Sequence, residues 1–380
     1  MRITFLSPSD NISGGTRVVA IYAQRLMERG HQVLVVTCAP DRLSLRQKAH
    51  AIMKRDWQQL QNDGVSQPGH IQLSGVPHKV LDRPRAITAA DLPDADIIIA
   101  TWWETALWMH AMPASKGRKV HLIQGYEVWL APEASSQVDD ALRLPNLKIA
   151  ISSDLKQTIE TKLGNLDINV VPNAVDLIQF DATARNKQEQ PTVGFVYAHA
   201  AIKGADICAR ACELAQETIP QLKVLAFGAD RPCSDVPLPA GTEFFYRPEQ
   251  AELKQIYARC DAWLFGSRLD SFGLPILEAM ACRTPVIAVP IGAAQDLLGD
   301  GTGILVAKES PEEMAAAIVA ICCQTPGEWQ QRSDRAYRKA HGYSWEDATN
   351  RILEVLSQKR VCSLATNDAS IPTKIAADDH

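Results

Sequence analysis

The sequence lacks the long apolar runs and the excess of positive charge that mark several large classes of protein. No run of about eighteen apolar residues occurs in its 380 residues, so we expect no membrane-spanning helix. The chain opens with Met1, Arg2 and a short strand, without an apolar stretch before a small-residue cleavage site, so we expect no signal peptide. The formal net charge of −5 and pI near 6.0 disfavour nucleic acid as a partner. We therefore expect a cytoplasmic protein.

Two kinds of site are also missing from the sequence. The nine cysteines form no CxxC pair and no metal-type spacing, so we expect reduced thiols, no disulfide and no metal site. The GxGxxG fingerprint of dinucleotide enzymes is absent, and the second strand ends at Val36, Thr37 and Cys38 without an acid for a ribose. A nicotinamide enzyme is therefore disfavoured. The cysteines are Cys38, Cys208, Cys212, Cys233, Cys260, Cys282, Cys322, Cys323 and Cys362.

Short apolar runs alternate with helical patterns in both halves of the chain, which predicts two doubly wound α/β sheets. We expect a first domain over 1–176, a polar linker over 177–191 and a second domain over 192–344, with a ligand cleft between them. The polar tail 362–380 predicts disorder. The predicted strands are 3–6, 33–37, 96–100, 120–124, 147–151, 192–196, 223–227, 262–265 and 286–289; the predicted helices include 204–215, 274–281, 311–321 and one at about 345–357.

The segment 267–287, SRLDSFGLPILEAMACRTPVI, is the most informative part of the chain. It predicts a turn at the carboxyl end of a buried strand, followed by a helix. Gly273 permits close backbone approach, Pro275 suits a first helical turn, and the free N–H groups of that turn attract anions. Asp270 and Glu278 stand eight residues apart beside this phosphate-type site. Two acids next to a phosphate site suggest a nucleotide sugar, although Asp270 could also simply cap the helix.

Two further segments predict anion-binding turns after strands. Gly14 and Gly15 follow the first strand, before a helix expected to start near Thr16, where backbone amides can reach a phosphate or an acceptor hydroxyl. A tight strand-to-helix turn is the alternative interpretation of this glycine pair. Lys203 precedes Gly204 at another helix start, where an ammonium and amides together suit a diphosphate; a solvated lysine is the alternative.

These motifs resemble those of the retaining glycosyltransferases of the GT-B "group 1" family, family 4. The resembling segments are SGGTRVV (13–19), VPNAVD (171–176), IKGAD (202–206), the acidic motif and DGTGILV (300–306), so that only about the last twenty residues fall outside. The resemblance implies a GT-B fold of two Rossmann-like domains, with the helix at about 345–357 packing back on the first domain. It also implies a nucleoside diphosphate sugar as donor and no cofactor or metal ion.

By this resemblance, Glu278 matches the residue that holds the nucleotide ribose, and Asp270 the residue that contacts donor-sugar hydroxyls. Lys203 and the amides around Phe272 and Leu274 are then expected to stabilise charge on the β-phosphate. The implied activity is transfer of a hexose-type sugar to a glycan, glycolipid or lipopolysaccharide acceptor by same-face attack, with the phosphate accepting the proton. The full predicted donor site comprises Gly14, Gly15, His199, Lys203, Asp270, Ser271, Phe272, Gly273, Leu274 and Glu278.

Four positions depart from the family pattern. The family usually has Glu at Asp270, Gly at Ala174 and at Arg283, and an Arg shortly before Lys203, where this chain has Tyr197, Ala198 and His199. Whether His199 compensates for that Arg is open. Two rivals stay under consideration. One is a GT-B epimerase or hydrolase that turns over the donor alone. The other is an inactive nucleotide-sugar-binding protein, which the departures at Asp270, Arg283 and the missing Arg favour.

The acceptor side has weaker signals. The segment 120–129, VHLIQGYEVW, ends a strand near the cleft, where Glu127 could be an acceptor-side acid or a salt-bridge partner. Asn173 could form a turn or contact a ligand. The only basic region could be a solvated face, or could contact an anionic glycan or the inner face of a membrane. It contains Arg42, Arg46, Lys48, Lys54, Arg55, Lys79, Arg83 and Arg85.

Overall fold

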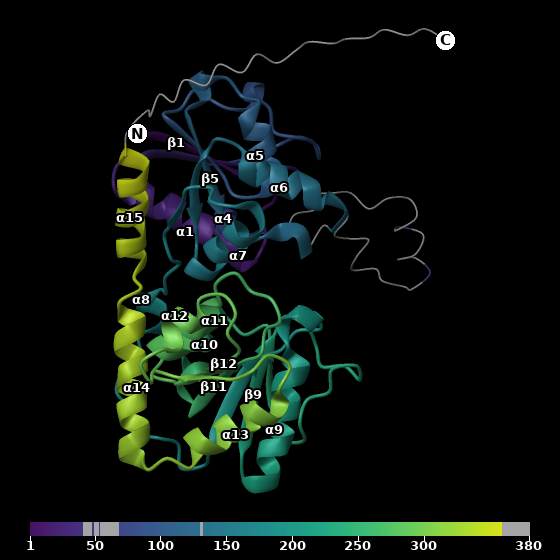
Figure 1. Cartoon of the computed structure of the whole chain (residues 1–380), viewed down its shortest axis with the longest axis vertical. Helices are drawn as coiled ribbons and strands as arrows, with labels where there is room; N and C mark the ends of the chain where they lie inside the picture. Colours follow the sequence, from purple (N-terminus) through teal and green to yellow (C-terminus); the bar gives the residue numbers. More distant parts are fainter. Residues whose placement is uncertain (41–47, 49–52, 54–67, 130–131, 359–380) are drawn as a thin grey trace.

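A computed structural model describes residues 1–40, 48, 53, 68–129 and 132–358. Two parallel sheets, each covered by helices, form two domains that follow one another along the long axis of the molecule (Figure 1). The predicted fold class, two doubly wound α/β domains, is therefore confirmed. The tail 362–380, predicted to be disordered, lies outside the described residues.

The first sheet has seven strands in the order β3-β2-β1-β4-β5-β6-β7, and the second has six in the order β10-β9-β8-β11-β12-β13. Both orders reverse direction beside the first strand of the domain, which is the arrangement that opens a ligand crevice at the strands' carboxyl ends. The first-sheet strands are β1 (Arg2–Ser7), β2 (Gln32–Thr37), β3 (His78–Val80), β4 (Ile97–Ala100), β5 (Arg118–Ile123), β6 (Leu147–Ala150) and β7 (Ile168–Val170). The second-sheet strands are β8 (Thr192–Val196), β9 (Lys223–Gly228), β10 (Glu243–Tyr246), β11 (Ala262–Phe265), β12 (Val286–Ala288) and β13 (Ile304–Leu305).

The nine predicted strands are all present, and the four that sequence patterns missed are β3, β7, β10 and β13. These four are the edge strands of the two sheets. A central strand of a parallel sheet is buried on both faces and is therefore a continuous apolar run, whereas an edge strand is short and partly exposed. The apolar signal is consequently weakest at the sheet edges.

The helices are α1 (Gly14–Glu28), α4 (His70–Leu73), α5 (Trp103–His110), α6 (Ser135–Arg143), α7 (Ser153–Leu163), α8 (Leu177–Phe180), α9 (Ala205–Thr218), α10 (Gln250–Ala258), α11 (Leu274–Ala281), α12 (Ala294–Leu298), α13 (Pro311–Cys322), α14 (Pro326–His341) and α15 (Trp345–Ser357). Helix α14 had no counterpart among the predicted helices. Its buried face consists of Trp329, Ser333, Ala336 and Ala340, and these mostly small residues give little apolar periodicity.

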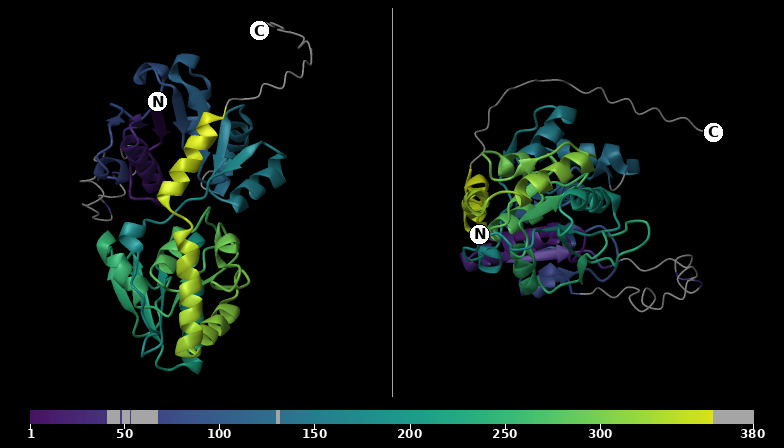
Figure 2. Two further views of the ribbon diagram at one scale, coloured as in Figure 1. Left: turned by 90° about the vertical axis from the view of Figure 1, so that its left-hand side faces the viewer. Right: turned by 90° about the horizontal axis from the view of Figure 1, so that it is seen from below.

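The chain crosses between the domains twice, and the two crossings lie side by side. The first crossing follows β7 and the second joins α14 to α15, so that α14 covers the second domain and α15 the first (Figure 2). The amide of Val175 donates to the carbonyl of Tyr343 at 3.0 Å. In the first domain, Trp345 of α15 meets the ring of Tyr22 on α1 edge-on, at 5.4 Å between centroids.

The predicted linker 177–191 is packed along the second domain and is not a free connection. Its first residues form α8, whose Phe180 is fully buried and contacts the Tyr257 ring at 6.0 Å. The amide of Ala182 donates to the carbonyl of Ala281 at 3.2 Å. One buried aromatic side chain in a polar stretch gave the sequence pattern too little signal to show this packing.

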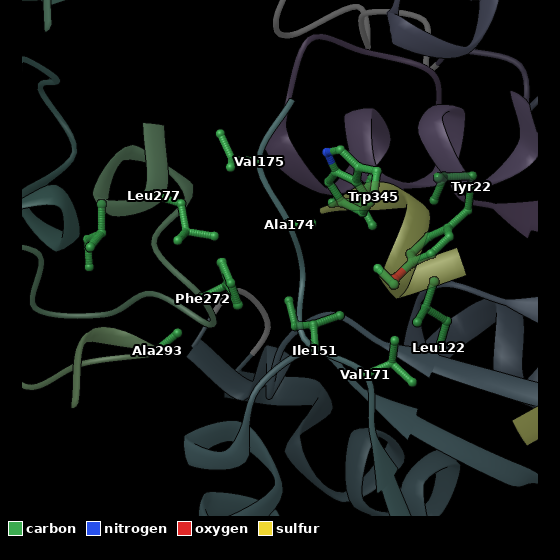
Figure 3. Packing of buried hydrophobic residues seen from close by; sticks show 14 of the residues in the cluster. Tyr22, Leu122, Ile151, Val171, Ala174, Val175, Phe272, Leu277, Ala293 and Trp345 are labelled. Atoms are coloured by element: carbon green, nitrogen blue, oxygen red, sulfur yellow. The ribbon is translucent and has the colours of Figure 1, made fainter. Parts of the chain in front are cut away.

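One apolar cluster continues from the first domain into the second (Figure 3). Leu122 and Ile151 lie on its first-domain side, Phe272 and Leu277 on its second-domain side, and the crossing segment with Ala174 and Val175 runs between them. Ala174, where the family usually has Gly, is 1% exposed. The loops that line the cleft are therefore supported from behind by a shared core.

Candidate active site

A cavity of about 770 Å³ lies between the two domains at the carboxyl ends of their strands. Loops after β1, β4 and β5 line its first-domain wall. The loop after β11, the start of α11 and Lys203 line its second-domain wall. Its volume falls within the range of roughly 300–1,000 Å³ that is usual for small-molecule sites. Ten of the eleven predicted site residues line it, and the exception is His199.

The loop between β11 and α11 is shaped by Gly273. Its φ of 85° is left-handed, and an added Cβ would lie 3.0 Å from the Phe265 ring, so a larger residue would be strained there. Helix α11 then begins at Leu274 with Pro275 in its first turn. The local sequence thus delivers the predicted turn and helix start to the cavity.

The carboxylate of Asp270 occupies the anion-binding groups of this turn. Its Oδ1 accepts from the amides of Phe272 at 3.1 Å and Gly273 at 2.8 Å, and its Oδ2 accepts from Lys203 Nζ at 2.9 Å. Sequence reasoning expected these amides and this ammonium to be available for phosphate. Because Asp is one methylene shorter than Glu, its carboxylate folds back on its own loop, as Asp commonly does in turns.

Glu278 is joined to a residue of the other domain. Its Oε1 accepts from Arg17 NH1 at 3.0 Å, its Oε2 accepts from the Tyr257 hydroxyl at 2.8 Å, and the residue is only 6% exposed. Arg17 also donates to Gln179 Oε1 at 3.1 Å. Burial and the neighbouring Glu278 carboxylate raise the pKa of Tyr257. Glu278 is thus fixed by an ion pair across the domain boundary.

Sequence reasoning missed Arg17 and Tyr257. Arg17 lies within the quoted motif SGGTRVV, one turn after Gly14, so its position on the cavity side of α1 was open to prediction. Its pairing with Glu278, which lies 261 residues further along the chain, was not open to prediction. Tyr257 lies in an ordinary helical pattern and carried no signal.

Gly14 and Gly15 form the first turn of α1, which begins two residues earlier than predicted. Ser13 caps this helix by accepting from the Thr16 amide at 3.4 Å. An added Cβ on Gly14 would lie 3.7 Å from Leu274, across the cavity, and one on Gly15 would lie 3.5 Å from Gln124 Oε1. Gly14 therefore lies where the two walls of the cavity come close together, and Gly15 lies beside Gln124 of its own wall.

His199, predicted as a donor-binding residue, lies outside the cavity lining. Its amide donates to the Asp230 carboxylate at 3.0 Å, and its Nε2 is 2.7 Å from the carbonyl oxygen of Arg231. The histidine thus binds the loop after β9 and does not line the cavity. Proximity to Lys203 in sequence was misleading because the chain turns through a 3-10 helix, Ala201–Lys203, between them.

Glu127 is 2% exposed and forms no ion pair with the described residues, which removes the support for its interpretation as a salt-bridge partner. Burial raises its pKa to about 8; the nearby Glu104 also raises it, while a bond from the Trp103 amide lowers it. The carboxyl group is therefore largely protonated at neutral pH.

The departure at position 283 has a structural explanation. Arg283 has a left-handed φ of 62°, where Gly is the least strained residue. Its guanidinium donates to Asp334 at 2.6 Å and lies 3.7 Å from the centroid of the Tyr337 ring. These contacts join the end of α11 to α14 and offset the backbone strain.

The predicted basic region is only partly within the described residues. Arg42, Arg46, Lys54 and Arg55 lie outside them. Arg85 pairs with Asp91 at 2.6 Å, and Lys79 donates to the Asp91 carbonyl at 2.6 Å. In the described part of the chain no helix is long and apolar enough to span a membrane, and no three His, Cys, Asp or Glu side chains are placed to hold a metal ion.

Two family models match the chain, and together they cover most of it. "Glycosyltransferase Family 4" matches residues 12–179, and "Glycosyl transferases group 1" matches residues 190–324. Among curated relatives, the D-inositol 3-phosphate glycosyltransferase of Rhodococcus jostii is 30% identical over 210 residues, 49% of this chain and 46% of that protein. The enzyme of the same name from Actinosynnema mirum is 38% identical over 109 residues, 28% of this chain and 26% of that protein. The chain thus spans between a quarter and a half of these relatives.

Solved structures share the fold over nearly the whole chain. Sucrose-phosphate synthase from Thermosynechococcus elongatus has a TM-score of 0.71 at 18% identity, covering 94% of this chain and 98% of that one. Anabaena HepE in complex with UDP and glucose has a TM-score of 0.70 at 21% identity, covering 94% and 100%. The arrangement of two parallel-sheet domains is therefore that of the GT-B structures.

Proposed function

Because this chain belongs to the group 1 glycosyltransferases, family 4, we propose that it transfers a hexose-type sugar from a nucleoside diphosphate sugar to a glycan, glycolipid or lipopolysaccharide acceptor. The proposed reaction retains the anomeric configuration and needs no metal ion. The observation that carries the proposal is the second-domain wall of the cavity, where Lys203 and the start of α11 lie beside Asp270 and Glu278. The HepE structure, which contains UDP and glucose, supports the donor class.

In the proposed mechanism, negative charge gathers on the β-phosphate as the bond from the anomeric carbon to the phosphate oxygen breaks. Lys203 and the first-turn amides of α11 stabilise this charge, which is a strong effect in a preorganised site. The acceptor hydroxyl oxygen forms its bond to the anomeric carbon on the same face, and its proton passes to the departing phosphate oxygen. No separate base is required.

Glu278 is proposed to hold the nucleotide ribose, with Arg17 and Tyr257 fixing its two oxygens. Asp270 is proposed to contact donor-sugar hydroxyls. For the diphosphate to reach Lys203 and the amides of Phe272 and Gly273, it must take the place of the Asp270 carboxylate there. The released carboxylate is then available to the sugar. Donor binding on this wall is therefore an exchange of one anion for another.

The test is thermal stabilisation of the purified chain by UDP, GDP, ADP, CDP and dTDP. A nucleotide that binds the folded state raises Tm by mass action. We expect one base to be preferred, and the shift to fall in Lys203→Ala and in Glu278→Ala. Lys223→Ala is the matched control, because Lys223 also pairs with a carboxylate in the second domain, has a similar exposure of 35% against 43% for Lys203, and lies outside the cavity.

Product analysis separates the proposed transferase from its two rivals. Transfer to an acceptor, with the anomeric configuration of the product read by NMR and the rate unchanged by EDTA, would support the full proposal. Turnover of the donor without acceptor would instead indicate an epimerase or hydrolase. The observation that favours an inactive binding protein is the exchange of anions that donor binding requires at Asp270. The absence of both a nucleotide-induced shift in Tm and turnover would indicate that the cavity binds no donor.

We also propose that the basic region from Arg42 to Arg85 brings the enzyme to the inner face of a membrane, where a lipid-linked acceptor would lie. Charge reversal at Arg46, Lys48, Lys54 and Arg55 should then reduce sedimentation with anionic vesicles. Unchanged sedimentation would contradict this location.

The curated relatives named above suggest a phosphorylated polyol as the acceptor class to compare with a neutral one.

A further inference from the structure

The first-domain wall of the cavity contains three buried side-chain oxygens that have no hydrogen-bond partner among the described residues. They are Gln124 Oε1, Glu127 Oε1 and Asn173 Oδ1. Glu127 and Asn173 are each 2% exposed. Buried polar atoms in folded proteins are nearly always hydrogen-bonded, and an exception calls for an explanation such as a ligand. The other unpartnered atoms of the described chain lie away from this cavity.

The three oxygens are held by segments that end on the same side of the cleft. Gln124 and Glu127 follow β5, and Asn173 follows β7. The amide of Asn173 donates to the carbonyl of Ile151 at 3.3 Å, which fixes the backbone that carries its side chain. The group thus lies in the segments that leave the carboxyl ends of β5 and β7, and the Asn173 backbone is bonded to Ile151, which directly follows β6.

This wall lies directly beside the donor loop. An added Cβ on Gly125 would lie 3.2 Å from Ser271 Oγ, and Ser152 Oγ donates to the Ser271 carbonyl at 2.7 Å. The proposed phosphate partners, Lys203 and the start of α11, lie on the opposite wall. Gln124, Glu127 and Asn173 are therefore among the groups that a second substrate would meet on the first-domain wall, across the cavity from the proposed phosphate partners.

The chemistry of the wall favours groups that donate hydrogen bonds. Amide and carboxyl oxygens accept from hydroxyls, whereas the oxygens of a phosphate dianion offer no donor. The cations that line the cavity in the described structure are already engaged, Lys203 with Asp270 and Arg17 with Glu278. His70 also lines it, and burial lowers the pKa of this side chain, so it is largely neutral at pH 7.

We propose that Gln124, Glu127 and Asn173 form the acceptor subsite, and that this subsite takes an uncharged, hydroxyl-rich group and discriminates against a phosphate at that position. The inference rests on the proposed glycosyl transfer and adds the acceptor class to it. Burial keeps Glu127 largely protonated at neutral pH, with its pKa raised to about 8, so its carboxyl group can also donate to a hydroxyl oxygen. The subsite then meets both the donor and acceptor functions of a sugar hydroxyl without a net charge.

The experiment compares acceptor use by the wild-type chain, Gln124→Met, Glu127→Leu and Glu127→Gln, with the donor whose nucleotide stabilises the chain. The acceptors are glucose, N-acetylglucosamine, myo-inositol and the monophosphate of each. We expect transfer to at least one neutral acceptor, at a kcat/KM more than about tenfold above that of its monophosphate. The KM for that acceptor should rise about tenfold in Gln124→Met and Glu127→Leu, with most of the loss recovered in Glu127→Gln.

Asn146→Leu is the control for a purely structural effect, because Asn146 is also buried and has an unpartnered amide nitrogen, but lies outside the cavity. Its acceptor KM should not change. Equal or better use of a monophosphate, or no neutral acceptor used while the nucleotide still binds, would overturn the inference. Failure of the proposed function itself would be seen separately, as loss of the nucleotide-induced Tm shift in the wild-type chain.

Discussion

The two walls of the cleft differ in how their polar groups are satisfied. On the second-domain wall, Lys203, Asp270 and Glu278 all have partners within the protein. On the first-domain wall, Gln124 and Glu127 keep oxygens without partners among the described residues. On the second-domain wall a ligand must compete with bonds inside the protein. On the first-domain wall it satisfies groups that are otherwise unpaired. The affinity for the proposed donor is thus lowered on the second-domain wall, and the affinity for the proposed acceptor is raised on the first-domain wall.

The largest expected effect comes from breaking the ion pair between Arg17 and Glu278, which fixes Glu278 on the second-domain wall, the proposed donor wall. Arg17→Met leaves Glu278 buried with only Tyr257 as partner, and we expect a loss of unfolding free energy of about 3–5 kcal/mol, measured by urea denaturation. Arg25→Met on the same helix removes an exposed pair with Glu28 and should cost less than about 0.5 kcal/mol. Equal losses in the two variants would show that the pair across the domains has no special weight.

The second prediction concerns Glu127 on the first-domain wall, the proposed acceptor wall, and the direction in which it makes stability change with pH. The pKa of Glu127 is raised from 4.5 to about 8 in the folded chain, so between these values the unfolded chain has lost a proton that the folded chain keeps. Stability should therefore fall as pH rises from 5 to 8, by about 1.4 kcal/mol per pH unit from this one group.

Glu127→Gln keeps the shape and removes the proton, so its stability should fall less steeply than that of the wild-type chain. Urea denaturation at pH 5, 6, 7 and 8 measures the difference between the two slopes. Parallel slopes would mean that Glu127 is ionised in the folded chain at neutral pH, and the acceptor wall would then carry a charge.

The third prediction concerns the removal of the internal carboxylate that competes with a ligand on the second-domain wall. Asp270→Asn removes the charge that holds Lys203, while an amide oxygen remains for the amides of Phe272 and Gly273. Because a partly exposed ion pair is worth up to about 1 kcal/mol, the Kd of the preferred nucleotide should fall by about fivefold at most. The rate of transfer should decrease, since the donor sugar loses a carboxylate contact.

Asp206→Asn is the matched control for this variant, because Asp206 pairs with Arg268 in the same domain but outside the cavity. Isothermal titration should give an unchanged nucleotide Kd for it. A weaker affinity in Asp270→Asn would indicate that Asp270 assists nucleotide binding and does not compete with it.

The smallest expected effect is at the point where the two walls meet. Gly125→Ala places a methyl group 3.2 Å from Ser271 Oγ, a contact that requires a shift of a few tenths of an ångström. We expect the acceptor KM to rise by about twofold, as for mild overpacking, and Ser271→Ala to restore it in the double variant. An additive effect in the double variant would show that the walls are independent at this contact.

Sequence patterns predicted what is local and contiguous. The nine central strands and the turn before α11 each lie in one short segment, whose apolar run or glycine specifies it. The pairing of Arg17 with Glu278, the fold-back of Asp270 onto its own loop and the clustering of Gln124, Glu127 and Asn173 depend on distant segments or on one side-chain rotamer. His199 shows the converse, because nearness to Lys203 in sequence did not place it in the cavity.

The two crossings between the domains lie side by side, joined where Val175 bonds to Tyr343 and bridges to Ser344. In Figure 1 the second of them runs with α14 and α15 along one flank of the molecule. Two adjacent crossings on one flank restrict sliding of the domains more than rotation about an axis through that flank, which is the geometry of a hinge. Rotation about that axis would separate the two walls, and it would have to break the bonds that join them, from Arg17 to Glu278 and from Ser152 to the Ser271 carbonyl.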